Sequence, residues 1–261
     1  MQRDEFDRFT DRLTGWAATA EGVLGLVLLG STAGTTHPPD GWSDHDFYVI
    51  AEPDATEGLR STTAWLPSRA ATVAVHERDT EHGAWVVYDD GHLLEYAVFT
   101  LDELAGSRTG AHRVAVDRAG DLADRIRPTL SPPPRDPRRL ATALHRALLV
   151  GGGRAARGER LAARRHLVDA VGSLLWLSAI LDQPGRGAAD RQDPWRRVEL
   201  SHPELAPVLD RILTQSDRTA ALELAQLAEA LAGRERWWPR ALALAVREQL
   251  ARPGVPSLIP L

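Results

Sequence analysis

Two aspartates separated by one residue are the clearest chemical feature of this 261-residue chain. Asp44 and Asp46 stand at the start of a predicted strand, 46–51, whose other residues are mostly apolar. Because side chains alternate across a strand, both carboxylates project from one face, while His45 and Phe47 project from the other. Adjacent carboxylates repel each other, and a divalent cation such as Mg²⁺ or Mn²⁺ is the usual compensation. We therefore expect a metal site here, with His45 used in packing.

A third carboxylate lies in a later predicted strand. Glu95 interrupts the apolar segment 92–99, where an ionised group buried alone would be costly. A position across the sheet from Asp44 and Asp46 would explain it, as a third metal ligand or a general base. The alternative is a Glu95 that faces solvent on an edge strand.

Upstream of the aspartates, the apolar run 23–29 ends in Gly30 and Ser31. This pattern predicts a buried strand that enters a tight turn. Such a turn presents backbone N–H groups and a hydroxyl without a bulky side chain, so it can hold the terminal phosphates of a nucleotide. Simple turn formation is the alternative role of Ser31.

The remaining pattern divides the chain into a mixed half and a helical half. Tandem prolines at 132–134 cannot continue a helix or a central strand, and the sequence beyond them is rich in Ala, Leu and Arg. We predict an α+β fold with an N-terminal mixed-sheet domain (1–130), a Pro-rich linker (131–135) and a C-terminal helical bundle (136–261). The other strands are predicted at 71–76, 84–88 and 114–117, and the helices at 4–20, 137–150, 160–182, 204–214, 218–232 and 235–251.

Three smaller features have simple structural interpretations. The glycines at 151–153 are predicted to end a helix. Trp237 and Trp238 are expected in the core or at a domain interface. Asp102 and Glu103 are expected to be solvated turn charges.

Composition limits the function classes. The net charge of −5 does not suit a nucleic-acid-coating protein. All 31 basic residues are arginines and there is no cysteine, which excludes lysine Schiff-base and thiolate chemistry. The charged N-terminus is unlike a secretory signal, and the apolar runs are too short to span a bilayer. We expect a cytoplasmic protein with neither membrane nor nucleic acid as a partner.

Together these motifs resemble the DNA polymerase β-like nucleotidyltransferase superfamily, and within it the antibiotic nucleotidyltransferases that modify aminoglycosides or lincosamides. The resemblance covers the first 130 residues by motif and the helical half by architecture only. Two departures concern triphosphate binding: the loop before Asp44 is longer than usual, and no Arg or Lys follows Gly-Ser. The matching segments are Leu29-Gly30-Ser31, Ser43-Asp44-His45-Asp46-Phe47 and Leu94-Glu95-Tyr96.

The resemblance implies transfer of a nucleoside monophosphate, with AMP from ATP expected, to a hydroxyl of a small molecule such as an aminoglycoside-like antibiotic. Asp44, Asp46 and Glu95 would hold two Mg²⁺ ions, and Gly30 and Ser31 would contact the β- and γ-phosphates of the nucleoside triphosphate. A protein- or RNA-directed nucleotidyltransferase is an alternative.

Two other interpretations of the function also remain open. A metal-dependent glycosyltransferase also uses Asp-x-Asp, but it predicts neither the upstream Gly-Ser nor Glu95. A degenerate nucleotidyltransferase domain could act as a binding module, although the intact carboxylates argue against it.

Overall fold

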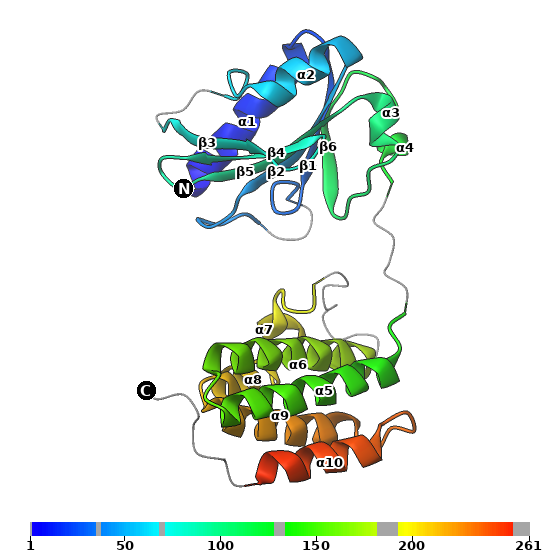
Figure 1. Ribbon diagram of the computed structural model, residues 1–261. Coiled ribbons are helices and arrows are strands. Elements are labelled where there is room, and N and C mark those ends of the chain that lie inside the picture. Colours follow the sequence, from blue (N-terminus) through cyan, green and yellow to red (C-terminus); the bar gives the residue numbers. More distant parts are fainter. Residues whose placement is uncertain (1, 35–37, 68–70, 128–133, 182–192, 253–261) are drawn as a thin grey trace. The chain divides into compact units, whose positions relative to one another are not determined.

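The computed structural model describes residues 2–34, 38–67, 71–127, 134–181 and 193–252. The chain divides into two units, residues 1–130 and 131–261. The first is built around a β-sheet and the second from helices (Figure 1), so the fold is α+β, as predicted. Among the described helices, none has the length and apolar character needed to cross a lipid bilayer.

The sheet of the first unit has six strands in the order β3-β4-β5-β2-β1-β6. β2 pairs with β5 in parallel, and the other neighbouring pairs are antiparallel. All the strands predicted from alternating or apolar segments form, with ends shifted by a few residues. Their bounds are Val23–Leu29 (β1), His45–Ala51 (β2), Val73–Arg78 (β3), Gly83–Tyr88 (β4), Leu93–Phe99 (β5) and His112–Asp117 (β6).

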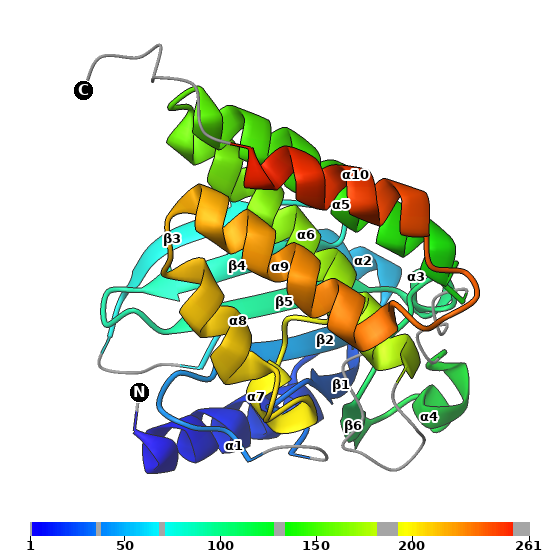
Figure 2. The ribbon, with the colours of Figure 1, turned by 90° about the horizontal axis from the view of Figure 1, so that it is seen from below.

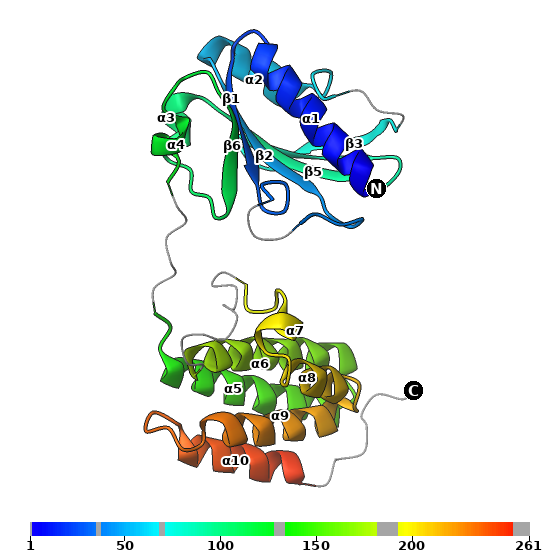
Figure 3. The ribbon, with the colours of Figure 1, turned by 180° about the vertical axis from the view of Figure 1, so that it is seen from behind.

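One face of the sheet carries α1 (Arg3–Thr19) and α2 (Pro53–Ser61), as Figure 3 shows. α1 is the predicted amphipathic helix, and its Phe9 and Leu13 are buried in the core on this face. α2 was not predicted, because its nine residues are mostly polar and give no apolar stripe. Together the two helices close this side of the sheet.

On the opposite face, the described helices of the first unit are the short α3 (Leu101–Leu104) and α4 (Leu122–Arg125). Leu104 and Leu122 pack there against Val27 and Ile50. This smaller core leaves Glu95 exposed on the same face.

The helices of the second unit surround one apolar core. α5 contacts α6, α9 and α10, and α9 also contacts α8, an arrangement visible in Figure 2. Trp238 is buried in this core, as predicted; its ring lies 4.9 Å from that of His145, and its Nε1 donates to Glu229. The bounds are Pro137–Ala156 (α5), Arg160–Leu181 (α6), Val198–Ser201 (α7), Ala206–Leu213 (α8), Asp217–Ala232 (α9) and Arg240–Ala251 (α10).

The glycines at 151–153 do not end a helix, and that prediction was wrong. α5 continues through them to Ala156. A Cβ atom on Gly151 would lie 3.0 Å from the Cβ of His166, and one on Gly152 would lie 2.2 Å from Leu250. These glycines therefore allow α6 and α10 to approach α5 closely.

Candidate active site on the open face of the sheet

The turn after β1 brings its backbone against the start of β2. Gly30 has a φ of 51°, a left-handed conformation that favours glycine, and its N–H donates to the carbonyl of Ala111. A Cβ atom at this position would lie 3.0 Å from Oδ2 of Asp46. The missing side chain thus lets the turn approach this carboxylate.

Thr32 fixes that approach and was not recognised from the sequence. Its buried hydroxyl donates to the carbonyl of Asp44 at 3.3 Å and accepts the N–H of Asp46 at 3.1 Å. One side chain therefore joins the turn to both aspartates. Its position directly after Gly-Ser was the available signal.

Ser31 lies between these two turn residues. Its Oγ is buried and has no hydrogen-bond partner among the residues that the structure describes. Since a buried hydroxyl without a partner is costly, this atom is available to an added group such as a phosphate oxygen.

Asp46 and Glu95 lie on the less covered face. Asp46 pairs directly with Glu95 in the parallel ladder of β2 and β5, where neighbouring strands lie about 4.8 Å apart. Asp44 precedes Asp46 by two residues and is partly buried, as Asp46 is. Glu95 is exposed, so the expectation that it is a buried charge was wrong, because the core under α3 and α4 does not extend to Glu95.

The side chains of the three acids do not converge on one point. In the described parts of the chain, no three His, Asp or Glu side chains lie close enough together to hold a metal ion. Asp46 and Glu95 therefore lie on adjacent strands of this face, and the backbone of Asp44 is held beside the turn by Thr32.

An aromatic and an acidic residue extend the row of Asp46 and Glu95. Trp85 of β4 pairs with Glu95, and Glu77 of β3 pairs with Trp85. Paired residues share a face, so Asp46, Glu95, Trp85 and Glu77 form one row across four strands. Strand order cannot be read from the sequence, which is why this row was not predicted.

Tyr48 borders the site further along β2. Its ring packs edge-on against Phe99 at 5.1 Å, and its hydroxyl hydrogen-bonds with Thr109. Burial raises the pKa of Tyr48, and the negative charge of Asp46 raises it further, although the Thr109 hydrogen bond opposes the shift. The phenol therefore stays protonated and neutral beside Asp46.

His45 lies on the opposite face, as predicted, and serves in packing. It is fully buried and stacks on Phe6 with ring centroids 3.7 Å apart. Its ring nitrogens lie 2.9 Å from Oγ1 of Thr10 and 3.0 Å from Nε2 of His92. These contacts attach the start of β2 to α1.

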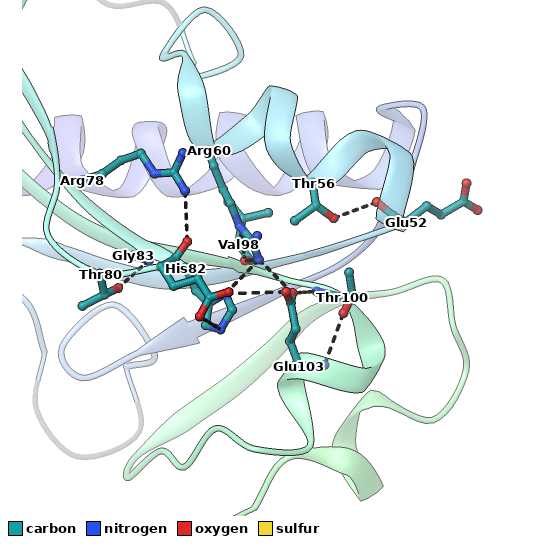
Figure 4. Close-up of polar contacts among 11 residues, drawn as sticks. Glu52, Thr56, Arg60, Arg78, Thr80, His82, Gly83, Val98, Thr100 and Glu103 are labelled. Atoms are coloured by element: carbon teal, nitrogen blue, oxygen red, sulfur yellow. Dashed lines mark hydrogen bonds and ion pairs between the residues drawn. The ribbon is translucent and has the colours of Figure 1, made fainter.

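A second polar cluster joins α2, β5 and α3 (Figure 4). Arg60 of α2 donates to the carbonyl of Val98 through Nε and Nη2, and Nη2 also contacts Glu103 at 2.8 Å and His82 at 3.0 Å. Glu103 accepts the N–H of Thr100 and completes a capping box. It is therefore not a solvated turn charge, and that prediction was wrong.

The ionisation of Glu103 reflects these contacts. Burial alone would raise its pKa, but hydrogen bonds from Thr100 and Arg60 and the charge of Arg60 hold the pKa below its ordinary value. The cluster lies at the C-terminal end of β5, whereas Glu95 lies near its N-terminal end. The cluster therefore stabilises the sheet without being part of the row that contains Asp46 and Glu95.

Comparisons with known proteins add the following. No protein-family model matches the sequence, and the search of curated proteins finds no match. Among solved structures, an aminoglycoside 6-adenyltransferase from Bacillus subtilis matches with 15% identity and a TM-score of 0.31, over 95% of this chain and 92% of that chain. A STING-associated CdnE c-di-GMP synthase from Capnocytophaga granulosa matches with 11% identity and a TM-score of 0.29, over 95% and 78% of the two chains. Likeness at these TM-scores assigns neither fold nor function, and the α+β architecture follows from the sheet and helices themselves.

Proposed function

We propose that this chain is a metal-dependent nucleotidyltransferase that transfers a nucleoside monophosphate, AMP from ATP, to a hydroxyl group of a small molecule. One observation carries the proposal: Asp46 lies opposite Glu95 on the open face, and the glycine turn after β1 touches Asp46. A phosphate-binding turn beside paired carboxylates is the minimum equipment for this reaction.

The turn would hold the nucleotide. The backbone at Gly30 lacks a side chain toward Asp46, so a phosphate can approach it closely. The hydroxyl of Ser31, which has no partner among the described residues, would donate to a phosphate oxygen. A charge-assisted hydrogen bond of this kind would satisfy a buried group that is otherwise unsatisfied.

The donor set suits magnesium. Carboxylate oxygens are the ligands that Mg²⁺ or Mn²⁺ prefers, and Asp44 and Asp46 would supply them. When bound, the two metal ions neutralise the triphosphate and lower the pKa of the acceptor hydroxyl. The turn beside Asp46 and the Ser31 hydroxyl would contact phosphate oxygens, so the site suits a metal ion bound together with a nucleotide better than a metal ion alone.

The chemistry would be a single displacement. The acceptor oxygen forms a bond to the α-phosphorus, the bond from that phosphorus to the β-bridging oxygen breaks, and pyrophosphate leaves. Glu95 would accept the acceptor's proton. Positioning and charge neutralisation would supply most of the acceleration.

The row beyond Glu95 supports an amino-sugar acceptor such as an aminoglycoside-like antibiotic. Trp85 is half-buried, and Glu77 and Glu95 pair with it on its two sides. An indole ring can contact the apolar face of a sugar, and a cation over an indole is attracted to it. The carboxylate of Glu77 would hold an ammonium group.

The test is pyrophosphate release from ATP, GTP, CTP and UTP with Mg²⁺ and pooled aminoglycosides or lincosamides. We expect release with one pool, and none from Asp46→Asn, which removes a ligand but keeps the size of the side chain. Asp11→Asn, an exposed change on α1, is the matched control and should retain full activity. Near-normal turnover by Asp46→Asn would overturn the proposal.

A further inference from the structure

The helical unit contains a cavity of about 480 Å³ between α6, α7, α8 and α9. Its walls are mainly aliphatic, and two of the leucines are left exposed, Leu200 at 69% and Leu231 at 41%. Protein cores are normally packed without spaces of this size, and small-molecule sites typically have this volume and lining. The aliphatic residues are Leu181, Leu200, Leu205, Val208, Leu227 and Leu231.

A hydroxyl without a partner lines the same cavity. Ser178 of α6 is 6% exposed, and its Oγ has no hydrogen-bond partner within the described residues. A serine inside a helix commonly donates to the carbonyl four residues earlier, as Ser173 does on the same helix with Asp169. Ser178 does not, so its hydroxyl is available inside the cavity as both donor and acceptor.

Three other polar residues line the cavity, Ser201, His202 and Glu204. Ser201 already donates to the carbonyl of Arg197 at 3.3 Å, so Ser178 is the hydroxyl open to a ligand. Glu204 is an exposed lining residue, and a carboxylate at the rim repels an anionic group.

We infer that this cavity binds a small neutral or cationic amphiphile, whose apolar body contacts the leucines and whose hydroxyl or amine bonds with Ser178. The inference is independent of the proposed nucleotidyl transfer, because it uses neither the sheet unit nor its carboxylates. Burial of an apolar body against these side chains provides the driving force, and the contact with Ser178 selects the head group.

The experiment uses the full chain and the neutral fluorophore Nile red, followed by displacement with octan-1-ol, octylamine and octanoate. We expect octanol and octylamine to displace the dye at lower concentrations than octanoate. Val208→Trp should fill the cavity and weaken dye binding at least tenfold with unchanged helical circular dichroism. Ser178→Ala should weaken octanol binding about fivefold, the usual effect of one neutral hydrogen bond.

Ser173→Ala is the matched control, since its hydroxyl is satisfied within α6, and it should bind octanol as the parent chain does. Equal octanol affinity in Ser178→Ala and Ser173→Ala would overturn the polar contact. Undiminished dye binding by a folded Val208→Trp protein, or displacement by octanoate as strong as by octylamine, would overturn the site as described.

Discussion

Gly30 and Asp46 are so close that a Cβ atom on the glycine would stand 3.0 Å from a carboxylate oxygen of the aspartate. The proposed phosphate-binding turn and the proposed metal ligand are therefore in direct contact. Gly30→Ala should lower the free energy of unfolding by about 1–2 kcal/mol through its left-handed backbone alone, and it should also displace Asp46 and reduce turnover at least tenfold. Urea unfolding and steady-state kinetics measure the two effects.

Gly91→Ala separates the effect on stability from the effect on turnover. Gly91 also has a positive φ of 83°, but no atom lies within 4 Å of its ideal Cβ position. It should therefore lose similar stability and keep its turnover. Equal loss of turnover in both variants would mean that contact with Asp46 is not the cause.

Removal of the Ser31 hydroxyl should affect nucleotide binding without harming the fold. Because its Oγ is buried and has no partner among the described residues, Ser31→Ala should leave the melting temperature unchanged or raise it. KM for the nucleotide should rise about tenfold or more, the effect of losing a hydrogen bond to a charged group. A lower melting temperature with unchanged KM would assign Ser31 to turn formation.

Glu95→Gln tests the proposed base. The change keeps the size of the side chain but removes its charge and its capacity to accept a proton, so turnover should fall about a hundredfold or more. Glu77→Gln, in the same row on β3, should keep kcat and raise only KM for a cationic acceptor. Similar kcat in both variants would remove Glu95 from the chemical step.

The cluster around Arg60 should stabilise the sheet unit. Arg60 is 9% exposed and bonds both Val98 and Glu103, so Arg60→Met should cost about 2 kcal/mol by leaving the Val98 carbonyl and the partly buried Glu103 carboxylate without their donor. Adding Glu103→Gln should recover part of this loss, because the unpaired carboxylate disappears. Additive losses in a double-mutant cycle by urea unfolding would contradict direct coupling.

Acid should destabilise the helical unit through His145. Its ring is fully buried, and burial lowers its pKa, with Arg247 contributing, although the carbonyl of Ala141 and the charge of Glu229 oppose the shift. Because the unfolded chain binds the proton more readily, this contribution to stability is complete above about pH 6.5 and is lost as the pH falls toward the folded-state pKa. The loss cannot exceed about 1.4 kcal/mol per pH unit.

Urea unfolding at pH 7.5 and 5.5 checks this dependence. His145→Gln should show a smaller difference between the two pH values than the parent chain. His166→Gln, a partly exposed position on α6, should retain the parent's difference. An unchanged difference in His145→Gln would identify another group as the source.

Local patterns in the sequence predicted the parts of the site that depend on one strand or one turn. The period of two in β2 was enough to put Asp46 on one face and His45 in the core on the other, whereas a shared face for the Asp44 side chain, which precedes β2, stays a prediction. This pattern could not predict which strand pairs with β2, because the parallel pairing that aligns Glu95 with Asp46 joins residues far apart in the chain. For the same reason Trp85 and Glu77, which join the row only through strand order, gave no signal.

Tertiary packing explains the other differences. Glycine has a low helix propensity, so a helix end at 151–153 was the local expectation, but close approach of α6 and α10 requires glycine there. Glu103 lies in a turn-like segment, and its role depends on its contact with Arg60. Arg60 belongs to α2, a helix that was not predicted because its sequence is mostly polar. These interactions all involve residues far apart in the chain.

The parallel pairing of β2 with β5 also has a kinetic consequence. The chain must pass through α2, β3 and β4 before it supplies the strand that carries Glu95, whereas β1 and β2 can pair across a short connection. Closing a longer loop has a greater entropic cost and slows folding. During synthesis, the turn and the two aspartates can assemble while β5 is still in the ribosome, so the acidic row is completed late and only in chains that have extended past Phe99.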